Sequence, residues 1–255
     1  MKNINNMLKS SHKVSLPRWE KAQKWQLAGW KKQNMHKTLY RRFAQWSKSI
    51  IKEKMHNSGD DWNLWWANKF NYYELIPQEL DNVIELGCGP YTNMRIILQK
   101  FKINHVVCSD PLVLHYVTFK GRWLAEAWKE RTILIDDHKA EECPFASNYF
   151  DLTILINVLD HVHDALLCLR QAIRITKSGG HLIIGQDLTN FEDARRIGDD
   201  IGHPIRIDHE MLDRVLLPNF RIDLYKILNR EEGRNPNAHY GTYIFTGKKD
   251  KYSEY

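Results

Sequence analysis

The sharpest chemical pattern in the chain is an apolar run that ends in an acid and then turns through two glycines. It reads Val-Ile-Glu-Leu-Gly-Cys-Gly-Pro over residues 83–90. Glycine has no Cβ, so the backbone at Gly87 and Gly89 can pass close to a ligand. Ligands of open α/β sheets bind at the carboxyl ends of the strands, where this loop must lie. The pattern predicts a cofactor site around Glu85, Gly87 and Gly89.

Two cofactors compete for a loop of this kind. A dinucleotide favours G-x-G-x-x-G, with its pyrophosphate on the N-terminus of the following helix. Here Thr92 stands where the third glycine would be, and the carboxylate of Glu85 would repel a pyrophosphate. S-adenosylmethionine (SAM) has no phosphate and carries an ammonium and a sulfonium, which a carboxylate attracts. Glu85 therefore favours SAM over NAD.

A second acid, Asp110, ends the next apolar run, over residues 106–110. A carboxylate at this position can accept hydrogen bonds from both ribose hydroxyls, as it does in dinucleotide-binding proteins. Asp110 thus indicates an adenosine cofactor without choosing between the two. The alternative is a helix N-cap, because Pro111 follows in the favoured first helical position.

Further motifs follow in order. Pro144-Phe145 and Phe150-Asp151 flank a turn, residues 157–162 read Asn-Val-Leu-Asp-His-Val, and Gly179-Gly180 precede an apolar run. Together with the glycine loop and Asp110, this series over about residues 80–190 resembles the class I SAM-dependent methyltransferases. The segment Trp-Glu-Lys-Ala-Gln-Lys-Trp at residues 19–25 is similar to methyltransferases from bacterial capsule and O-antigen gene clusters, and phosphoethanolamine-type N-methyltransferases share the core.

The resemblance implies roles for particular residues. Glu85, Gly87 and Gly89 would frame the methionine part of SAM, with Asn157 beside it, and Asp110 would hold the ribose. An acid after the third strand would approach the adenine. Asp136, Asp137 and Glu141 compete for that role, and the sequence does not choose among them.

His161 is the candidate general base. A neutral imidazole can take a proton from a hydroxyl or an ammonium near pH 7. The alternative is a histidine that packs or bonds to the backbone. Asp160, His163 and Asp164 surround it and could suggest a metal site, but adjacent residues in one turn rarely converge on an ion. No metal is therefore expected.

The methyl acceptor should be bound outside the shared core, by the N-terminal helical segment and by two loops near the carboxyl edge of the sheet. Arg and His in these loops suit an anionic or heavily hydroxylated small molecule. The candidates are His203, Arg206, Arg230, Arg234, His239 and Tyr240. The alternative is that the arginines pair with acids nearby in the sequence, namely Asp199, Asp200, Asp208, Glu231 and Glu232.

Alternation of β-branched runs with helical patterns after Pro77 predicts an α/β, Rossmann-like fold of the class I methyltransferase type, with a mainly parallel sheet. The predicted strands are 82–86, 105–109, 132–135, 152–156, 181–186, 220–227 and 240–247. The last two are joined by a segment too short for a crossover helix, so we expect the last strand to be antiparallel. The predicted domains are a disordered tail (1–16), an N-terminal helical cap (17–76) and a SAM-dependent methyltransferase domain (77–255).

The charge of the chain is unevenly distributed. Residues 1–60 hold fourteen Lys and Arg against three acids, a net of +11, so the rest carries −5 of the total of +6. A basic segment of this kind suits nucleic acid, anionic lipid or an anionic substrate, or is a solvated helix surface. No signal peptide or membrane-spanning run is evident. Four widely spaced cysteines fit a reducing cytoplasm.

These features predict an enzyme that methylates O or N of a small sugar-like or phosphorylated acceptor, in capsule or surface polysaccharide biosynthesis. A phosphoethanolamine-type N-methyltransferase is one alternative, and an RNA methyltransferase that uses the basic N-terminus is another. Amino-adenine methylases carry Asp/Asn-Pro-Pro-aromatic after strand four, whereas Asn157 is followed here by Val158 and Leu159, so nucleic acid is disfavoured. A non-catalytic binding module is the third hypothesis. The oligomeric state is not indicated.

Overall fold

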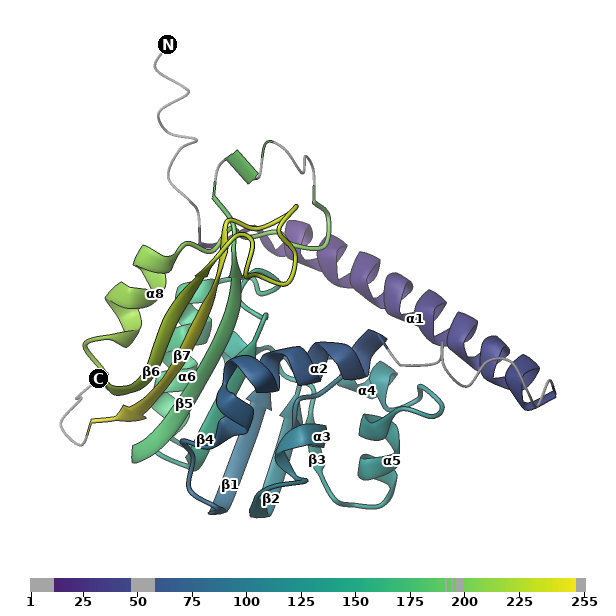
Figure 1. Ribbon diagram of the computed structural model, residues 1–255, viewed down its shortest axis with the longest axis horizontal. Coiled ribbons are helices and arrows are strands. Elements are labelled where there is room, and N and C mark those ends of the chain that lie inside the picture. The colour runs from purple at the N-terminus through teal and green to yellow at the C-terminus, as the bar shows by residue number, and fades with distance from the viewer. Residues whose placement is uncertain (1–11, 47–57, 191, 194, 196–199, 251–255) are drawn as a thin grey trace.

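A twisted seven-stranded sheet forms the centre of the computed structural model, which describes residues 12–46, 58–190, 192–193, 195 and 200–250 (Figure 1). The strand order is β3-β2-β1-β4-β5-β7-β6. The strands are β1 (Glu79–Leu86), β2 (Lys102–Ser109), β3 (Leu134–Asp136), β4 (Phe150–Ile156), β5 (Thr176–Leu188), β6 (Phe220–Asn229) and β7 (Gly241–Lys249). Each predicted strand is present, with bounds that differ by a few residues.

The sheet is parallel from β3 to β5, and β7 runs antiparallel to both of its neighbours. The connection between β6 and β7 covers only residues 230–240, too few for the crossover that parallel pairing needs. The predicted mainly parallel sheet with an antiparallel last strand is therefore confirmed. The carboxyl ends of β1, β2, β3 and β4 meet at one edge, where the glycine loop lies.

Helices cover both faces of the sheet (Figure 1). They are α1 (Leu16–Trp46), α2 (Ser58–Lys69), α3 (Met94–Ile97), α4 (Val113–Tyr116), α5 (Trp123–Lys129), α6 (Ala165–Ile175) and α8 (His209–Leu216), with short 3-10 turns η1 (Asn71–Tyr73) and η2 (Ala140–Glu142). Residues between α4 and α5 include Gly121 in a left-handed conformation, at φ +68°. That conformation interrupts helical hydrogen bonding, so α4 and α5 are separate short helices.

The two N-terminal helices contact the rest of the chain differently. Trp66 of α2 is fully buried against the sheet, and a Cβ at Gly185 of β5 would lie 2.6 Å from its ring. The first turns of α1 reach the carboxyl edge instead, where Arg18 donates to the carbonyls of Asp200 and Ile201. The middle of α1 still contacts the body, where Trp30 packs against Tyr91, and the last turns of the helix extend away from it (Figure 1). Part of the N-terminal segment thus packs as core, and part lies over the ligand-binding edge.

The predicted disordered tail is wrong for the residues just before α1. Lys13 forms a β-bridge with Asp164, and the N–H of Val14 donates to the carbonyl of His163 over 2.9 Å. These backbone hydrogen bonds attach the segment to the start of α6. Residues 1–11 of the predicted tail lie outside the described residues. Among the described helices, none combines the length and apolar character needed to cross a bilayer.

Candidate active site

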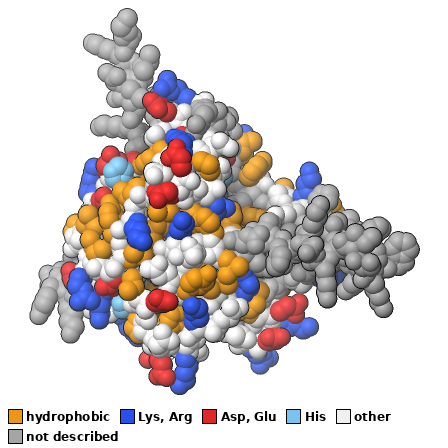
Figure 2. Space-filling model, in the orientation of Figure 1, with side chains coloured by type: hydrophobic (Ala, Val, Ile, Leu, Met, Phe, Trp, Pro, Cys, Tyr) orange, Lys and Arg blue, Asp and Glu red, His pale blue; other side chains and the backbone are white. Residues whose placement is uncertain are grey.

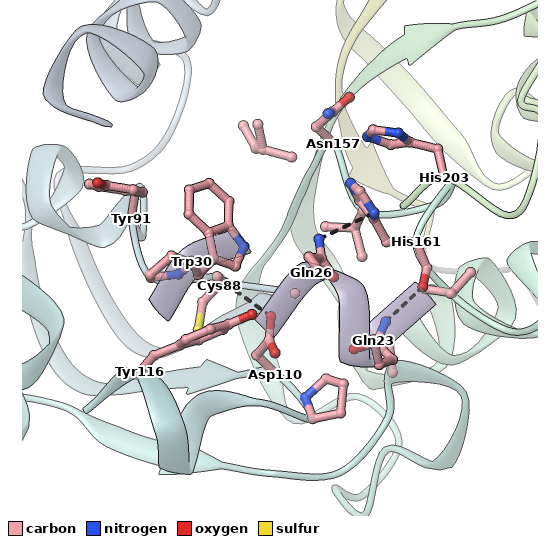
Figure 3. Close-up of a pocket in the computed structure, with 18 of the residues that line it drawn as sticks. Gln23, Gln26, Trp30, Cys88, Tyr91, Asp110, Tyr116, Asn157, His161 and His203 are labelled. Atoms are coloured by element: carbon pink, nitrogen blue, oxygen red, sulfur yellow. Dashed lines mark hydrogen bonds between the residues drawn. The ribbon is translucent and has the colours of Figure 1, made fainter. Parts of the chain in front are cut away.

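A cavity of about 700 Å³ opens at the carboxyl edge of β1, β2 and β4, beneath α1 and α2. Figure 3 shows two groups of side chains around it, with α1 passing between them. Trp30, Tyr91, Asp110 and Tyr116 lie on one side, and Asn157, His161 and His203 lie on the other (Figure 3). The two groups come from different elements of the fold, so the two ends of the cavity differ in chemistry.

The glycine loop lines the first end of the cavity. Gly87 and Gly89 both have positive φ, +68° and +55°. A Cβ at Gly87 would lie 2.6 Å from the side chain of Val158, so this glycine allows the loop to pack on the segment after β4. A Cβ at Gly89 would meet nothing within 4 Å, so the space beside it belongs to the cavity. The sequence-predicted loop therefore lines the site, and its two glycines serve different purposes.

Glu85 lines the cavity, but its carboxylate is engaged by the loop itself. One oxygen accepts from the hydroxyl of Thr92, and the other accepts from the backbone N–H (3.1 Å) and the side-chain amide (2.8 Å) of Asn93. Asn63 of α2 in turn donates to the Asn93 side chain over 3.0 Å. Glu85 is only 2% exposed, and burial raises the pKa of its carboxyl group. Its position indicates that it shapes the loop and places an acid beneath the cavity.

Asp110 makes the contact of a cap and also lines the cavity. Its Oδ2 accepts from the backbone N–H of Gly89 (3.1 Å), and its Oδ1 accepts from the N–H of Leu112 (2.8 Å). The second bond stabilises its own turn in the manner of a cap, while the residue still lines the cavity. An ionised carboxylate has about four acceptor sites, so two remain for ribose hydroxyls. Burial raises the pKa of Asp110 to about 6.

Of the three acids proposed to approach adenine, only Glu141 lines the cavity. Its Oε1 accepts from the backbone N–H groups of His163 (2.7 Å) and Asp164 (3.0 Å), so it also holds the turn before α6. Asp137 is exposed and is not part of the lining, because the chain turns outward after β3. Asp136 accepts from Ser109 and contacts His138. Asp137 therefore lies outside the cavity lining, and Glu141 is the one of the three acids that borders the cavity.

Asn157 ends β4 in a left-handed conformation, at φ +56°, and lines the cavity. Its side-chain oxygen accepts from the backbone N–H of Asp187 over 3.1 Å, and its own N–H donates to Gly185 over 2.7 Å. These bonds tie the ends of β4 and β5 together. Asparagine tolerates this backbone better than most residues, which explains its presence at the turn.

His161 lies at the second end of the cavity, with its ring orientation set by the backbone. Its Nδ1 is 3.0 Å from the carbonyl oxygen of Gly202 and 3.3 Å from the side-chain amide of Gln26. The carbonyl can only accept, so a neutral ring that bonds to Gly202 carries its proton on Nδ1. Its own carbonyl accepts from the side chains of Trp19 (3.0 Å) and Gln23 (3.2 Å) of α1. Burial lowers the pKa of His161, and the nearby Asp160 opposes that shift. Nε2 therefore keeps its lone pair near neutral pH.

Comparison with known proteins agrees with this geometry. Residues 84–184 match a family model described as a methyltransferase domain. These residues therefore form a methyltransferase domain. Over 82 residues the chain is 35% identical to the uncharacterized protein YafE of Escherichia coli K12, a match that covers 32% of this chain. The match spans about a third of YafE, 34% of its length.

Solved structures share the fold at low sequence identity. N-methyltransferase NodS from Bradyrhizobium japonicum WM9, in complex with S-adenosyl-L-homocysteine, has a TM-score of 0.54 and 13% identity, over 85% of this chain and 98% of NodS. The 4+2 cyclase SpnF has a TM-score of 0.55 and 15% identity, over 75% of this chain and 80% of SpnF. Since these neighbours differ in reaction, the fold alone does not define the chemistry of the methyltransferase domain.

The predicted acceptor residues divide into two sets. His203, Arg234 and His239 line the cavity, whereas Arg206, Arg230 and Tyr240 do not. Arg230 is held 2.7 Å from Asp193, and the hydroxyl of Tyr240 contacts His209. Arg234 is paired with Asp187 at 3.3 Å. The acids Asp187 and Asp193 are distant in sequence from these arginines, so the sequence-local pairing considered above is not the one that forms.

Several residues of the methyltransferase domain and of its N-terminal helices line the cavity but were not predicted from the sequence. Tyr91, Tyr116 and His138 follow the first three strands, and Gln23, Gln26, Trp30 and Trp62 come from α1 and α2. The ring of Trp30 packs edge-on against Tyr91 at 5.6 Å between centroids. The one signal for the helical residues was the density of tryptophan before residue 70, which fits packing as well as ligand contact.

Proposed function

We propose that the enzyme transfers the methyl group of SAM to a small anionic acceptor. The observation that carries the proposal is the chemical difference between the two ends of one cavity. Its first end holds the acids Glu85 and Asp110 beside the glycine loop. Its second end holds His161, His203 and Arg234. A cationic cofactor suits the first end, and an acceptor with negative charge suits the second.

The residues present fit SAM at the first end. Gly89 leaves open space beside the backbone, and Asp110 retains acceptor capacity. The buried Glu85 and the half-buried Asp110 offer carboxylates that attract a sulfonium and an ammonium. A volume of about 700 Å³ lies within the range of about 300–1,000 Å³ typical of ligand pockets. It leaves room for a second small molecule beside the cofactor.

When bound, SAM supplies an electrophilic methyl carbon: an acceptor lone pair forms the new bond, the C–S pair returns to sulfur, and the acceptor proton leaves. The chain's own contribution is alignment and exclusion of water, which together can lower a barrier by about 7–11 kcal/mol. Trp19, Trp30 and Trp62 of the N-terminal helices line the cavity and displace water from it. His161 borders the acceptor end and is the residue we place against the nucleophilic atom.

Arg234 supports an anionic acceptor. Its guanidinium carbon lies 3.1 Å from the centroid of the Trp62 ring, and Nη2 lies 3.3 Å from Asp187. Its Nε is buried and has no hydrogen-bond partner among the described residues. Stacking fixes the plane of the guanidinium, so a phosphate or carboxylate could be recognised by its fork geometry. His203 and His239 add donors nearby.

A phosphorylated sugar of surface-polysaccharide biosynthesis is the acceptor class that we favour. A phosphoethanolamine-type amine is the alternative, because it too carries phosphate and because NodS is named an N-methyltransferase. Nucleic acid is less well supported, since acidic and basic side chains are interspersed on the face that Figure 2 shows. A single-sign basic field is the usual footprint of nucleic-acid binding.

Two measurements test the proposal. Calorimetry should detect SAM and S-adenosylhomocysteine, and NAD should bind more weakly than either. A panel of sugar phosphates, phosphoethanolamine and their dephosphorylated partners is then incubated with SAM and read by mass spectrometry for a gain of one methyl group. Tighter binding of NAD than of SAM would contradict the proposal that SAM is the cofactor. Methylation confined to neutral acceptors would contradict the proposal that the acceptor is anionic.

A further inference from the structure

Three potential metal ligands converge beside the acceptor end of the cavity, which His161 and His203 line and behind which Asp160 is buried. Asp160, His161 and His203 each offer a ligand atom, and these atoms all lie within 4.8 Å of one another. Nε2 of His161 is 3.9 Å from Oδ1 of Asp160. Two metal–ligand bonds of about 2.2 Å can span at most about 4.4 Å, so this pair can share one ion as it stands. The His161 and His203 rings lie 4.4 Å apart between centroids.

Outer contacts orient both imidazoles in the way that metal-binding histidines require. Nδ1 of His161 faces the carbonyl of Gly202 at 3.0 Å, and Nδ1 of His203 faces Oδ2 of Asp200 at 2.6 Å. With the proton of each neutral ring on Nδ1, both Nδ1–H groups donate to these oxygens and both Nε2 lone pairs are available; Nδ1 of His161 also lies 3.3 Å from the side-chain amide of Gln26. A ligating histidine almost always donates its other N–H to a carbonyl or a carboxylate. Both kinds of partner occur here.

The carboxylate of the cluster is also held in place. Asp160 is 3% exposed, and its Oδ1 accepts from Nε2 of Gln186 over 3.1 Å. A buried carboxylate is costly unless it is paired or coordinates a metal. Asp200, which holds His203, accepts in turn from the backbone N–H groups of Gly202 (3.0 Å) and His203 (3.2 Å). The positions of the potential ligands are therefore set by hydrogen bonds from β5 and from the loop before α8.

We propose that Asp160, His161 and His203 bind a divalent first-row transition metal ion at the acceptor end of the cavity. Two imidazoles and one carboxylate suit Zn²⁺, Fe²⁺, Mn²⁺ or Co²⁺ better than Mg²⁺ or Ca²⁺, which prefer oxygen ligands. Three protein ligands leave coordination positions open for a substrate. The sequence argued against a metal because neighbours in one turn rarely converge, but the third ligand comes from a loop some forty residues later, before α8.

The role of the ion rests on the proposed function. An acceptor hydroxyl bound to the ion would lose its proton more readily, and a phosphate would be held by the same charge. The proton passes to solvent, and the ion keeps its oxidation state. Under this arrangement His161 positions the ion, which takes over the activation of the acceptor.

A second group in the same cavity region supplies the matched control. Asp136, Asp137 and His138 also offer ligand atoms within 4.8 Å of one another. Asp137 and His138 are exposed, however, and Asp136 is occupied by Ser109 and His138 at 2.7 Å each. His138→Ala therefore removes a histidine of comparable geometry without touching the proposed site.

The test uses the full, untagged chain after treatment with a chelator. Co²⁺ alone is titrated in, and binding is followed by calorimetry and by visible absorption, which reports the coordination of the ion. We expect one Co²⁺ per chain in the wild type and in His138→Ala. His203→Ala should weaken the binding by more than about 100-fold, and Asp200→Asn, which loses only the orienting contact, by about 10–100-fold.

Three outcomes would overturn the metal site: no Co²⁺ binding by folded wild type, unchanged binding in His203→Ala, or loss of binding in His138→Ala instead. SAM calorimetry on the same metal-free samples separates this proposal from the proposed function. It also verifies that His203→Ala is folded. If the protein binds SAM but not Co²⁺, only the proposed metal site is refuted. If it binds Co²⁺ but not SAM, the proposed methyl transfer is refuted and the metal site stands.

Discussion

The carboxylate of Asp110 accepts a hydrogen bond from the backbone N–H of Gly89, over 3.1 Å, and so joins the loops that follow β1 and β2. The glycine loop and the acid that we propose to hold the ribose are therefore joined directly. A change in Asp110 should disturb both.

Asp110→Ala should weaken SAM binding by about 1–3 kcal/mol, the scale of losing hydrogen bonds to a charged group. Asp110→Asn retains one acceptor oxygen for Gly89 and should lose less. Calorimetry with S-adenosylhomocysteine measures both variants. Unchanged affinity in Asp110→Ala would show that the residue serves only to stabilise its own turn.

SAM binding should weaken in acid because the pKa of Asp110 in the free protein is raised to about 6. The ionised form is the one that accepts from the ribose, so the affinity is fully present above pH 6 and declines as the pH falls through that value. Below it, each pH unit corresponds to about a tenfold loss. Titrations between pH 5 and 8 should show this step in the wild type and a flatter profile in Asp110→Asn. An equal step in both would assign the titration to another group.

The two glycines of the loop should respond differently to alanine. Gly89→Ala adds a Cβ that meets nothing within 4 Å, so only the positive φ is unfavourable, by about 1–2 kcal/mol. Gly87→Ala adds the same strain and also places a Cβ 2.6 Å from Val158. Denaturant unfolding should therefore show a larger loss of stability for Gly87→Ala. Adding Val158→Ala should restore part of that loss, and no restoration would mean that the contact is not the cause.

Much of the fold, and the gathering of the glycine loop and two acids at one end of the cavity, could be predicted because local sequence determines both. A strand, a two-glycine turn and a terminal acid are contiguous, so Glu85, Gly87, Gly89 and Asp110 were located from residue types alone. The acceptor end could not be predicted in the same way. His203, Arg234 and His239 reach the cavity from loops whose paths depend on tertiary contacts, and Arg206 and Arg230 are just as basic but lie elsewhere.

The ion pairs that form in those loops explain why the sequence did not show which basic residues reach the cavity. Arg230 pairs with Asp193 and Arg234 with Asp187, both about forty residues away in the chain. Burial of both acids, at 1% side-chain exposure each, makes these pairs more favourable than contacts with exposed neighbours such as Glu231. Sequence patterns give no information on contacts of this range. The same reason concealed the approach of His203 to Asp160 and His161.

His161→Ala should lower kcat with little change in SAM affinity, because the residue borders the acceptor end and not the glycine loop. Loss of acceptor activation typically lowers the rate by about 10²–10⁴-fold. His163→Ala is the matched control, since His163 lies in the same turn but outside the cavity lining. Steady-state kinetics at saturating SAM measures kcat for the wild type and both variants. A decrease in kcat of less than about threefold would show that His161 serves only in packing.

The last prediction concerns the charge of the acceptor. Arg234 is stacked on Trp62 and paired with Asp187, so its guanidinium plane is fixed at the cavity wall. Arg234→Lys keeps the charge but loses the planar fork, and should raise the KM of a phosphorylated acceptor by about 10–100-fold, the equivalent of one or two charged hydrogen bonds. The Kd of SAM should not change. Arg230→Lys, whose ion pair with Asp193 lies outside the cavity lining, should leave the KM unaltered.

The decisive comparison is a phosphorylated acceptor against its dephosphorylated partner. The wild type should favour the former, and Arg234→Lys should lose most of that preference. Equal kcat/KM for the two acceptors in the wild type would exclude an anion at this site and favour a neutral glycan.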